Sequence, residues 1–180
     1  SSTSRGLGDV YKRQICKEIA LQQGFFEDPD VVIETIYFGG GTPSLLPAQA
    51  TMQILATIHQ HFKVDETAEI TLEANPDDIS LQKLIDFKTI GINRLSMGVQ
   101  SFIDEDLTWM NRAHRSAAAF EAIKLAREVG ISNISIDLIY GIPTLTDENW
   151  IQNIDTAVGL GVQHLSCYAL TVEPKTALHT

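Results

Sequence analysis

The sequence predicts an α/β fold, a partial (β/α) barrel with a parallel sheet, and three observations favour it. From residue 34 onward, apolar runs of strand length alternate with segments of helical period, as in successive βα units. A weak repeat, Gly-apolar-x-x-apolar-Ser, recurs at residues 91–96, 130–135 and 161–166, each time between a helix and a strand. The strands themselves alternate polar and apolar residues. Equivalent registers in successive units are required by a barrel, whereas a doubly wound sheet imposes no such uniformity.

The expected strands lie near residues 34–39, 69–74, 92–99, 133–140 and 164–170. The expected helices lie near residues 15–24, 47–62, 80–90, 116–129 and 147–160. Hydroxyl residues suit helix N-caps, and glycine suits the position after a helix end. The expected N-caps are Ser80, Ser116 and Thr146, and the expected glycines are Gly91, Gly130 and Gly161. Residues 1–14 show neither the helical nor the strand periodicity of apolar residues. We therefore expect a poorly ordered segment there and one domain over residues 15–180.

Composition excludes several classes of function. The formal net charge of −10, with no Lys/Arg cluster, disfavours nucleic acid as a partner. No run approaches the roughly 18 apolar residues of a membrane span, and the start has no apolar signal region, so a cytoplasmic location is expected. The two cysteines, Cys16 and Cys167, match no metal-ligand spacing. No metal site is therefore expected from the residues present.

The polar face of the predicted sheet points to a ligand. A small closed barrel fills its interior with branched apolar side chains, whereas these strands place Glu73, Asp137 and several hydroxyls on that face. An unpaired buried carboxylate is costly, so each needs a partner. Arg94, Arg112, a hydroxyl, or the amine or ribose of a ligand could serve. An internal salt-bridge network is the structural alternative.

Three consecutive glycines, Gly39 to Gly41, follow the first expected strand. Residues without Cβ let the backbone approach a ligand, although taken alone such a run is more often a tight turn than a site. Ser44 replaces the third glycine of G-x-G-x-x-G, and no Gly-Lys-Ser/Thr follows, so a dinucleotide fingerprint and a P-loop are both excluded. His114 lies in a loop before a helix and is expected to be either exposed or functional.

Five ordered segments make the sequence recognisable. They are YFGGGTPS at 37–44, TLEANP at 71–76, LSMGVQS at 95–101, NRAH at 111–114 and IDLIYGIP at 136–143. Over residues 31–180 the chain resembles the radical S-adenosylmethionine family of oxygen-independent coproporphyrinogen III oxidase and its relative, the haem chaperone.

The resemblance implies a partial (β/α) TIM-like barrel that holds S-adenosylmethionine and a [4Fe-4S] cluster. It also implies a tetrapyrrole partner, haem or coproporphyrinogen III, and haem-accepting apo-proteins for the chaperone branch. The cofactor-binding positions carried over to this sequence are Gly40, Gly41, Thr42, Glu73, Gln100, Arg112 and Asp137. No catalytic residue is assigned.

Within that family, Ser44, Ala74-Asn75, Ser101 and His114 look more like the haem-chaperone branch. The expected function is therefore haem binding and transfer. The alternative is oxidative decarboxylation of propionates by the oxidase, and a further alternative is an unrelated βα-barrel enzyme that uses Glu73 and Asp137 as acid and base.

One departure from the family concerns its cluster motif, C-x-x-x-C-x-x-C, which this chain does not contain. We expect a fragment that is inactive alone, in which residues 1–14 replace the true N-terminal segment and the C-terminal part is missing.

Overall fold

The computed structural model describes residues 2–28 and 30–171, with side chains from Val10 onward. Its centre is a five-stranded sheet whose strands lie side by side in chain order. They are β1 (Val32–Phe38), β2 (Lys63–Ala74), β3 (Arg94–Gln100), β4 (Asn133–Tyr140) and β5 (His164–Ala169). Every neighbouring pair is parallel. This arrangement confirms the predicted α/β partial barrel, because strands in sequential order with helical crossovers form a barrel wall.

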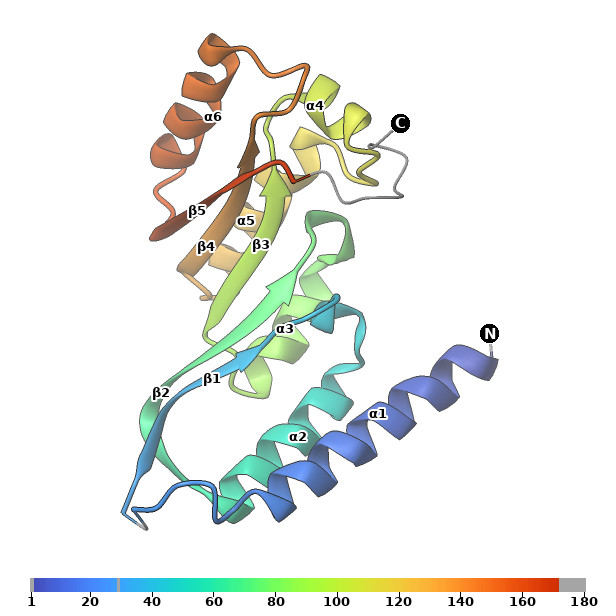
Figure 1. Cartoon of the computed structure of the whole chain (residues 1–180), viewed down its shortest axis with the longest axis vertical. Coiled ribbons are helices and arrows are strands. Elements are labelled where there is room, and N and C mark those ends of the chain that lie inside the picture. Colours follow the sequence, from blue (N-terminus) through green and yellow to red (C-terminus); the bar gives the residue numbers. More distant parts are fainter. Residues whose placement is uncertain (1, 29, 172–180) are drawn as a thin grey trace.

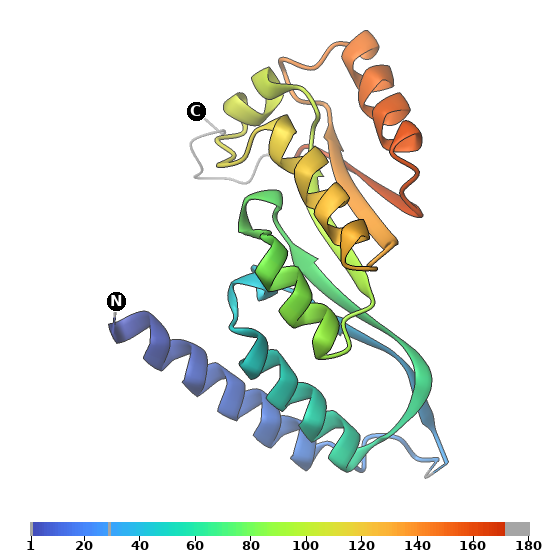
Figure 2. The ribbon, with the colours of Figure 1, turned by 180° about the vertical axis from the view of Figure 1, so that it is seen from behind.

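The helices lie on one side of the sheet, as Figures 1 and 2 show from opposite directions. Those that follow the first four strands are α2 (Ala48–His61), α3 (Leu81–Thr89), α5 (Ser116–Glu128) and α6 (Asp147–Gly159). Short elements also appear that the sequence pattern did not predict: the 3-10 turns η1 (Pro43–Leu45) and η2 (Pro76–Asp78), and the helix α4 (Asp104–Trp109). They are too brief to develop a helical period.

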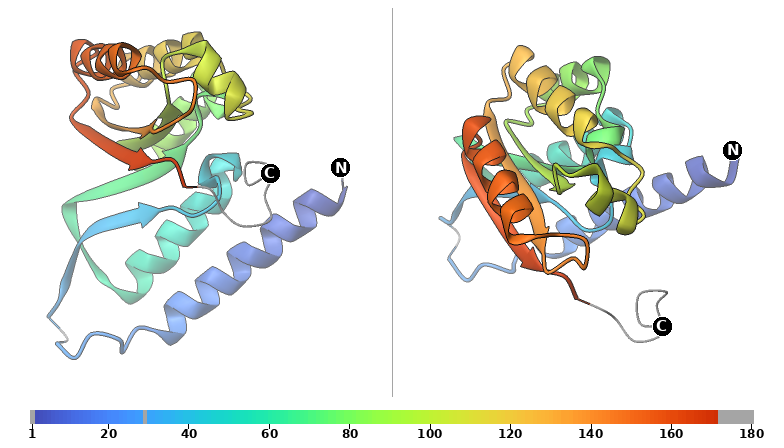
Figure 3. Two further views of the ribbon diagram at one scale, coloured as in Figure 1. Left: turned by 45° about the horizontal axis from the view of Figure 1, so that its top comes forward. Right: turned by 90° about the horizontal axis from the view of Figure 1, so that it is seen from above.

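The predicted division of the sheet into two faces is confirmed. Leu95, Met97 and Ile136 are fully buried and pack in one cluster with Phe87 of α3 and Ile123 of α5. The opposite face carries the polar residues of the same strands. Figure 3 shows the twisted sheet with β5 at one edge and β1 at the other.

The first helix differs from expectation. Helix α1 runs over Ser2–Leu21, where the sequence pattern indicated a helix only from Ile15 and a poorly ordered segment before it. Its C-terminal part lies against α2, and its N-terminal part projects beyond the end of α2, as both views of the ribbon show. Because each added residue extends an existing helix at little entropic cost, a helix anchored by packing continues through residues of weak propensity. The expected start of the helix at Ile15 was therefore wrong, whereas the expectation of poor order for residues 1–14 stays a prediction.

Two of the three predicted N-caps are confirmed. Ser80 accepts a hydrogen bond from the amide of Lys83, and Thr146 accepts one from the amide of Asn149. Ser116 is instead the first residue of α5, and its amide donates to Asp104 Oδ1 at 2.8 Å. A carboxylate from α4 thus takes the place that the sequence assigned to a hydroxyl, because tertiary contact brings it to the helix start.

The weak repeat has a structural meaning at each helix end. Gly91, Gly130 and Gly161 have φ of 105°, 82° and 64°. At the first of them, the Ile92 amide donates to Phe87 O at 3.0 Å and the Gly91 amide donates to Lys88 O at 3.1 Å, which is the Schellman arrangement. The glycine therefore reverses the chain so that the next strand enters the sheet at a common register.

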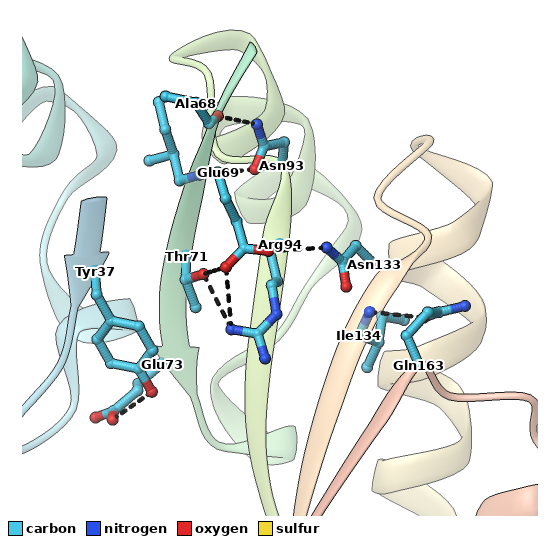
Figure 4. Close-up of polar contacts among 11 residues, drawn as sticks. Tyr37, Ala68, Glu69, Thr71, Glu73, Asn93, Arg94, Asn133, Ile134 and Gln163 are labelled. Carbon is cyan, nitrogen blue, oxygen red and sulfur yellow. Dashed lines mark hydrogen bonds and ion pairs between the residues drawn. The ribbon is translucent and has the colours of Figure 1, made fainter. Parts of the chain in front are cut away.

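At two of the three repeats, a side-chain amide then attaches the new strand to the preceding one (Figure 4). Asn93 donates to Ala68 O and accepts from the Ile70 amide, both at 2.8 Å. Gln163 accepts from the Ile134 amide at 2.9 Å. These two residues occupy the same place in the repeat, so the same contact recurs at separate strand pairs.

Candidate functional site

A cavity of about 270 Å³ lies on the polar face, towards the C-terminal ends of the first four strands. It is lined by Gly41, Thr42, Glu73, Ala74, Asn75, Ser96, Gly98, Gln100, Arg112 and Asp137. Six of the seven predicted site residues are therefore brought together, and the seventh, Gly40, adjoins them through a hydrogen bond to Glu73. Residues from four βα units meet at this point, which is where sites of barrel folds collect.

The glycines after β1 fill two different requirements. Gly40 and Gly41 have φ of 83° and 68°, in the left-handed region, and open space lies where a Cβ would be. Gly39 has ordinary backbone, but a Cβ there would lie 2.6 Å from Cε1 of Tyr37. The glycine run thus forms a turn, and its backbone borders the cavity without side chains in between.

Glu73 is held at both carboxylate oxygens. The Tyr37 hydroxyl donates to Oε1 at 2.8 Å (Figure 4), and the Gly40 amide donates to Oε2 at 2.9 Å. Partial burial raises the pKa of Tyr37, the Ser96 hydroxyl lowers it, and the nearby Glu73 raises it further. Glu73 therefore ties the glycine turn to β2. Tyr37 was not a predicted site residue, although it lies within the recognised segment 37–44.

Arg94 forms no ion pair with Glu73 or Asp137, the two carboxylates of the cavity, among the described residues. Its Nη1 lies 3.6 Å from Glu69 Oε1 and donates to Thr71 Oγ1 at 3.2 Å, further down the same face (Figure 4). Among the described residues, neither Glu73 nor Asp137 takes part in an ion pair. The alternative of an internal salt-bridge network at these two residues is therefore not supported.

Asp137 of β4 is half-buried and faces the cavity. Burial is the main cause that raises its pKa above the ordinary value of 3.8, and the negative charge of Glu73 adds to it. The hydroxyl of Ser166 and the nearby His164 and Arg94 act in the opposite direction. A carboxylate in this position is stabilised by a cation or a hydroxyl group that enters the cavity.

Arg112 and Gln100 also line the cavity. Arg112 Nη2 donates to Asn75 Oδ1 at 3.0 Å, and Asn75 Nδ2 donates in turn to Thr42 Oγ1 at 3.4 Å. Gln100 has φ of 68°, which is unusual for a residue with a side chain. Asn75 and Ser96 were missed as site residues; both lie in the recognised segments, but nothing in the sequence separated them from neighbours that serve the fold.

His114 is only 3% exposed, so the expectation of an exposed residue was wrong. Its Nε2 lies 3.0 Å from Val99 O. Ser44 and Ser101, two of the residues that favoured the haem-chaperone branch, are likewise buried rather than at the cavity surface.

The chain's residues do not fit an iron-sulfur cluster. Cys16 lies on α1 and Cys167 on β5, at separate places in the fold. Among the residues described with side chains, no group of three or more His, Cys, Asp or Glu is placed to hold a metal ion. In the same part of the chain, no helix is both long and apolar enough to cross a membrane.

Comparison with known proteins agrees with this architecture. A heme chaperone HemW from Synechocystis is 38% identical over 176 residues, which are 98% of this chain and 42% of that protein. A heme chaperone HemW from Bacillus subtilis is 40% identical over 148 residues, which are 82% of this chain and 39% of that protein. The chain thus spans about two fifths of the length of these curated relatives.

Solved structures give the same result. The coproporphyrinogen III oxidase HemN from Escherichia coli, described as a radical SAM enzyme, superposes with a TM-score of 0.82 at 30% identity. The match covers 93% of this chain and 38% of that one. The sequence model of the radical SAM superfamily matches residues 15–157, well over half of the chain. The chain therefore belongs to the radical SAM superfamily.

Proposed function

We propose that this chain is the S-adenosylmethionine-binding part of a haem chaperone-like radical SAM protein. One observation carries the proposal: a single cavity gathers Gly41, Thr42, Glu73, Gln100, Arg112 and Asp137 from different βα units. The family match also overturns the alternative of an unrelated βα-barrel enzyme.

The chemistry of the cavity suits this ligand. S-adenosylmethionine carries a sulfonium, an ammonium, a carboxylate and ribose hydroxyls, so it needs both anionic and donor groups. The bare glycine turn suits the methionyl end, and the guanidinium of Arg112 suits a carboxylate. Asp137 and Gln100 suit the ribose hydroxyls or an ammonium. Two carboxylates against one guanidinium also favour a ligand with net positive charge.

When bound, a [4Fe-4S] cluster supplies the electron that makes S-adenosylmethionine reactive in this family. This chain's own residues offer no thiolate set for it, so its part is to bind and orient the nucleoside. We infer that the chain alone does not catalyse radical chemistry.

Haem binding and transfer to apo-proteins is the function that we propose for the whole protein. Its support is the agreement among relatives of 38–40% identity that carry the name heme chaperone. The structural similarity to HemN at 30% identity keeps coproporphyrinogen oxidation as the second candidate. The tetrapyrrole and the accepting protein belong to the proposal for the complete protein.

Binding of S-adenosylmethionine to the purified chain tests the first part. Isothermal titration calorimetry is expected to show one site, with affinity lowered about tenfold or more by Arg112→Ala because a charged hydrogen-bond donor is lost. Arg115→Ala is the matched control, since Arg115 donates to Thr108 Oγ1 outside the cavity. Equal binding by both variants, or no binding by the unmodified chain, would contradict the proposal.

The complete protein separates the two candidate functions. Haem transfer to an apo-protein without loss of propionate carboxylates supports the chaperone. Decarboxylation of coproporphyrinogen III that depends on S-adenosylmethionine supports the oxidase and refutes the first candidate.

A further inference from the structure

Strand β3 ends in a three-residue turn at the cavity. The Ser101 amide donates to Val99 O at 2.9 Å, and Gln100 at the centre has φ of 68°. The pairing of β3 with β4 shifts at the same place, from Met97 opposite Ile136 to Gln100 opposite Leu138. A turn of this type is rare and strained for a residue with a side chain. Surrounding contacts must therefore hold it.

The imidazole of His114 makes such a contact. Its Nε2 lies 3.0 Å from Val99 O, the same carbonyl that closes the turn. A carbonyl oxygen can only accept, so Nε2 carries the proton and donates. Both lone pairs of Val99 O are then used. The contact is shielded from water, because the His114 side chain is 1% exposed and Val99 is fully buried.

The loop that carries His114 also carries Arg112. Asn111 turns this loop with φ of 55°, and the Arg112 amide donates to Leu107 O at 2.9 Å. The Arg112 guanidinium then reaches Asn75, as described above. His114 thus joins the Arg112 loop to the end of β3. It lies two residues after Arg112, and the residue that it contacts, Val99, lies directly before Gln100.

The other ring nitrogen has a different environment. His114 Nδ1 has no hydrogen-bond partner among the residues that the structure describes, and Asp77 Oδ1 lies 3.7 Å from it. The ring is therefore oriented by its bond to Val99 rather than by two equal contacts.

We propose that His114 is a positioning residue for the S-adenosylmethionine pocket. Its Nε2–H holds the strained turn at Gln100 and docks the Arg112 loop, so that both side chains face the cavity before the ligand arrives. The effect on ligand binding rests on the proposed function, whereas the effect on the turn does not.

Nuclear magnetic resonance of the isotope-labelled chain tests the turn without a ligand. His114→Gln places an amide donor near the position of Nε2, whereas the shorter His114→Asn does not reach Val99 O. We expect the amides of Gln100, Ser101 and Arg112 to keep their shifts in His114→Gln. In His114→Asn these signals are expected to move, and the Ser101 amide to exchange roughly tenfold faster.

A core variant away from the cavity, Ile131→Val, provides the control for general destabilisation. If His114→Asn changes exchange uniformly over the sheet, as Ile131→Val does, or leaves those three signals unmoved, His114 is only a structural residue. The unmodified chain gives an independent test that holds even if His114→Asn does not fold. The ring nitrogen shifts are expected to show the proton on Nε2, and a proton on Nδ1 alone would overturn the proposal.

The ligand test is separate. By calorimetry, S-adenosylmethionine is expected to bind His114→Asn about tenfold more weakly than His114→Gln. Equal affinities would refute the role in binding. If the unmodified chain binds no S-adenosylmethionine, the proposed function fails, while the resonance data still decide whether His114 holds the turn.

Discussion

Glu73 and Asp137 are carboxylates of the same cavity in different electrostatic situations. Glu73 receives one donor at each oxygen, from Tyr37 and from the backbone of Gly40. Asp137 is partly removed from water, and its pKa is raised mainly by that burial. Glu73 therefore holds the glycine turn in place. The carboxylate of Asp137 can still gain a hydrogen bond or an opposite charge from a ligand.

Asp137→Asn is expected to stabilise the chain at neutral pH. Because the pKa of Asp137 is raised in the folded chain, the folded state holds this proton to higher pH than the unfolded state does. As pH rises from 3.8 through the raised pKa, the ionisation of Asp137 lowers the free energy of unfolding. Asparagine does not ionise, so the substitution removes this destabilisation. Thermal melts from pH 7 downward should show a higher Tm for the variant, with the difference shrinking toward pH 3.8.

The same substitution is expected to weaken S-adenosylmethionine binding at pH 7, because a negative charge leaves the cavity. Asp155→Asn, on the exposed side of α6, is the control for a change in net charge. A lower Tm for Asp137→Asn at pH 7 than for the unmodified chain would contradict the argument.

At the scale of secondary structure, all three repeats end a helix at a glycine, and two of the three add a side-chain amide. The glycine ends the helix in the left-handed conformation, and the amide two residues later bonds to the backbone of the preceding strand. Backbone groups at the entry of each strand would otherwise lack partners. The weak repeat in the sequence therefore marks a recurring glycine helix end, to which Asn93 and Gln163 add the same kind of contact with the preceding strand.

Asn93→Ala is expected to lower the free energy of unfolding by about 1–3 kcal/mol, because it leaves the Ala68 carbonyl and the Ile70 amide unpaired. Gln163→Ala removes one strand contact, to the Ile134 amide, and should have the smaller effect. Urea unfolding of both variants measures the difference. Equal stabilities for Asn93→Ala and the unmodified chain would show that water replaces these contacts.

At the scale of the whole molecule, the chain is one wall of a barrel with a polar cavity at the C-terminal ends of its strands. The family match spans residues 15–157, and the relatives are more than twice as long as the matched part. The described residues form a polar cavity but do not gather three thiolates. We therefore expect this chain to bind its ligand without activating it.

Anaerobic reconstitution with iron and sulfide is expected to give no cluster absorbance near the visible bands of [4Fe-4S] proteins, because the cluster requires cysteine ligands that this chain does not supply. A radical SAM protein with the three-cysteine motif, treated in parallel, is the positive control. One full cluster per chain would refute this expectation.

The sequence by itself was sufficient to predict the parallel sheet, which residues lie on each of its two faces, and most of the residues that line the cavity. Alternating residues place side chains on opposite sides of a strand, so Glu73 and Asp137 share a face wherever parallel strands pair in register. Glycines that require positive φ likewise mark their turns, as at Gly40 and Gly91. The recognised segments then indicated the ligand.

Only the tertiary structure decided the contacts between segments distant in the chain. The burial of His114, the turn at Gln100 and the pairing of Arg94 with Glu69 depend on which loops and strands meet. The same holds for the start of α5, where Asp104 replaces the predicted cap. Local periodicity is set by each residue and its neighbours, whereas these contacts are set by packing of the complete sheet and its helices.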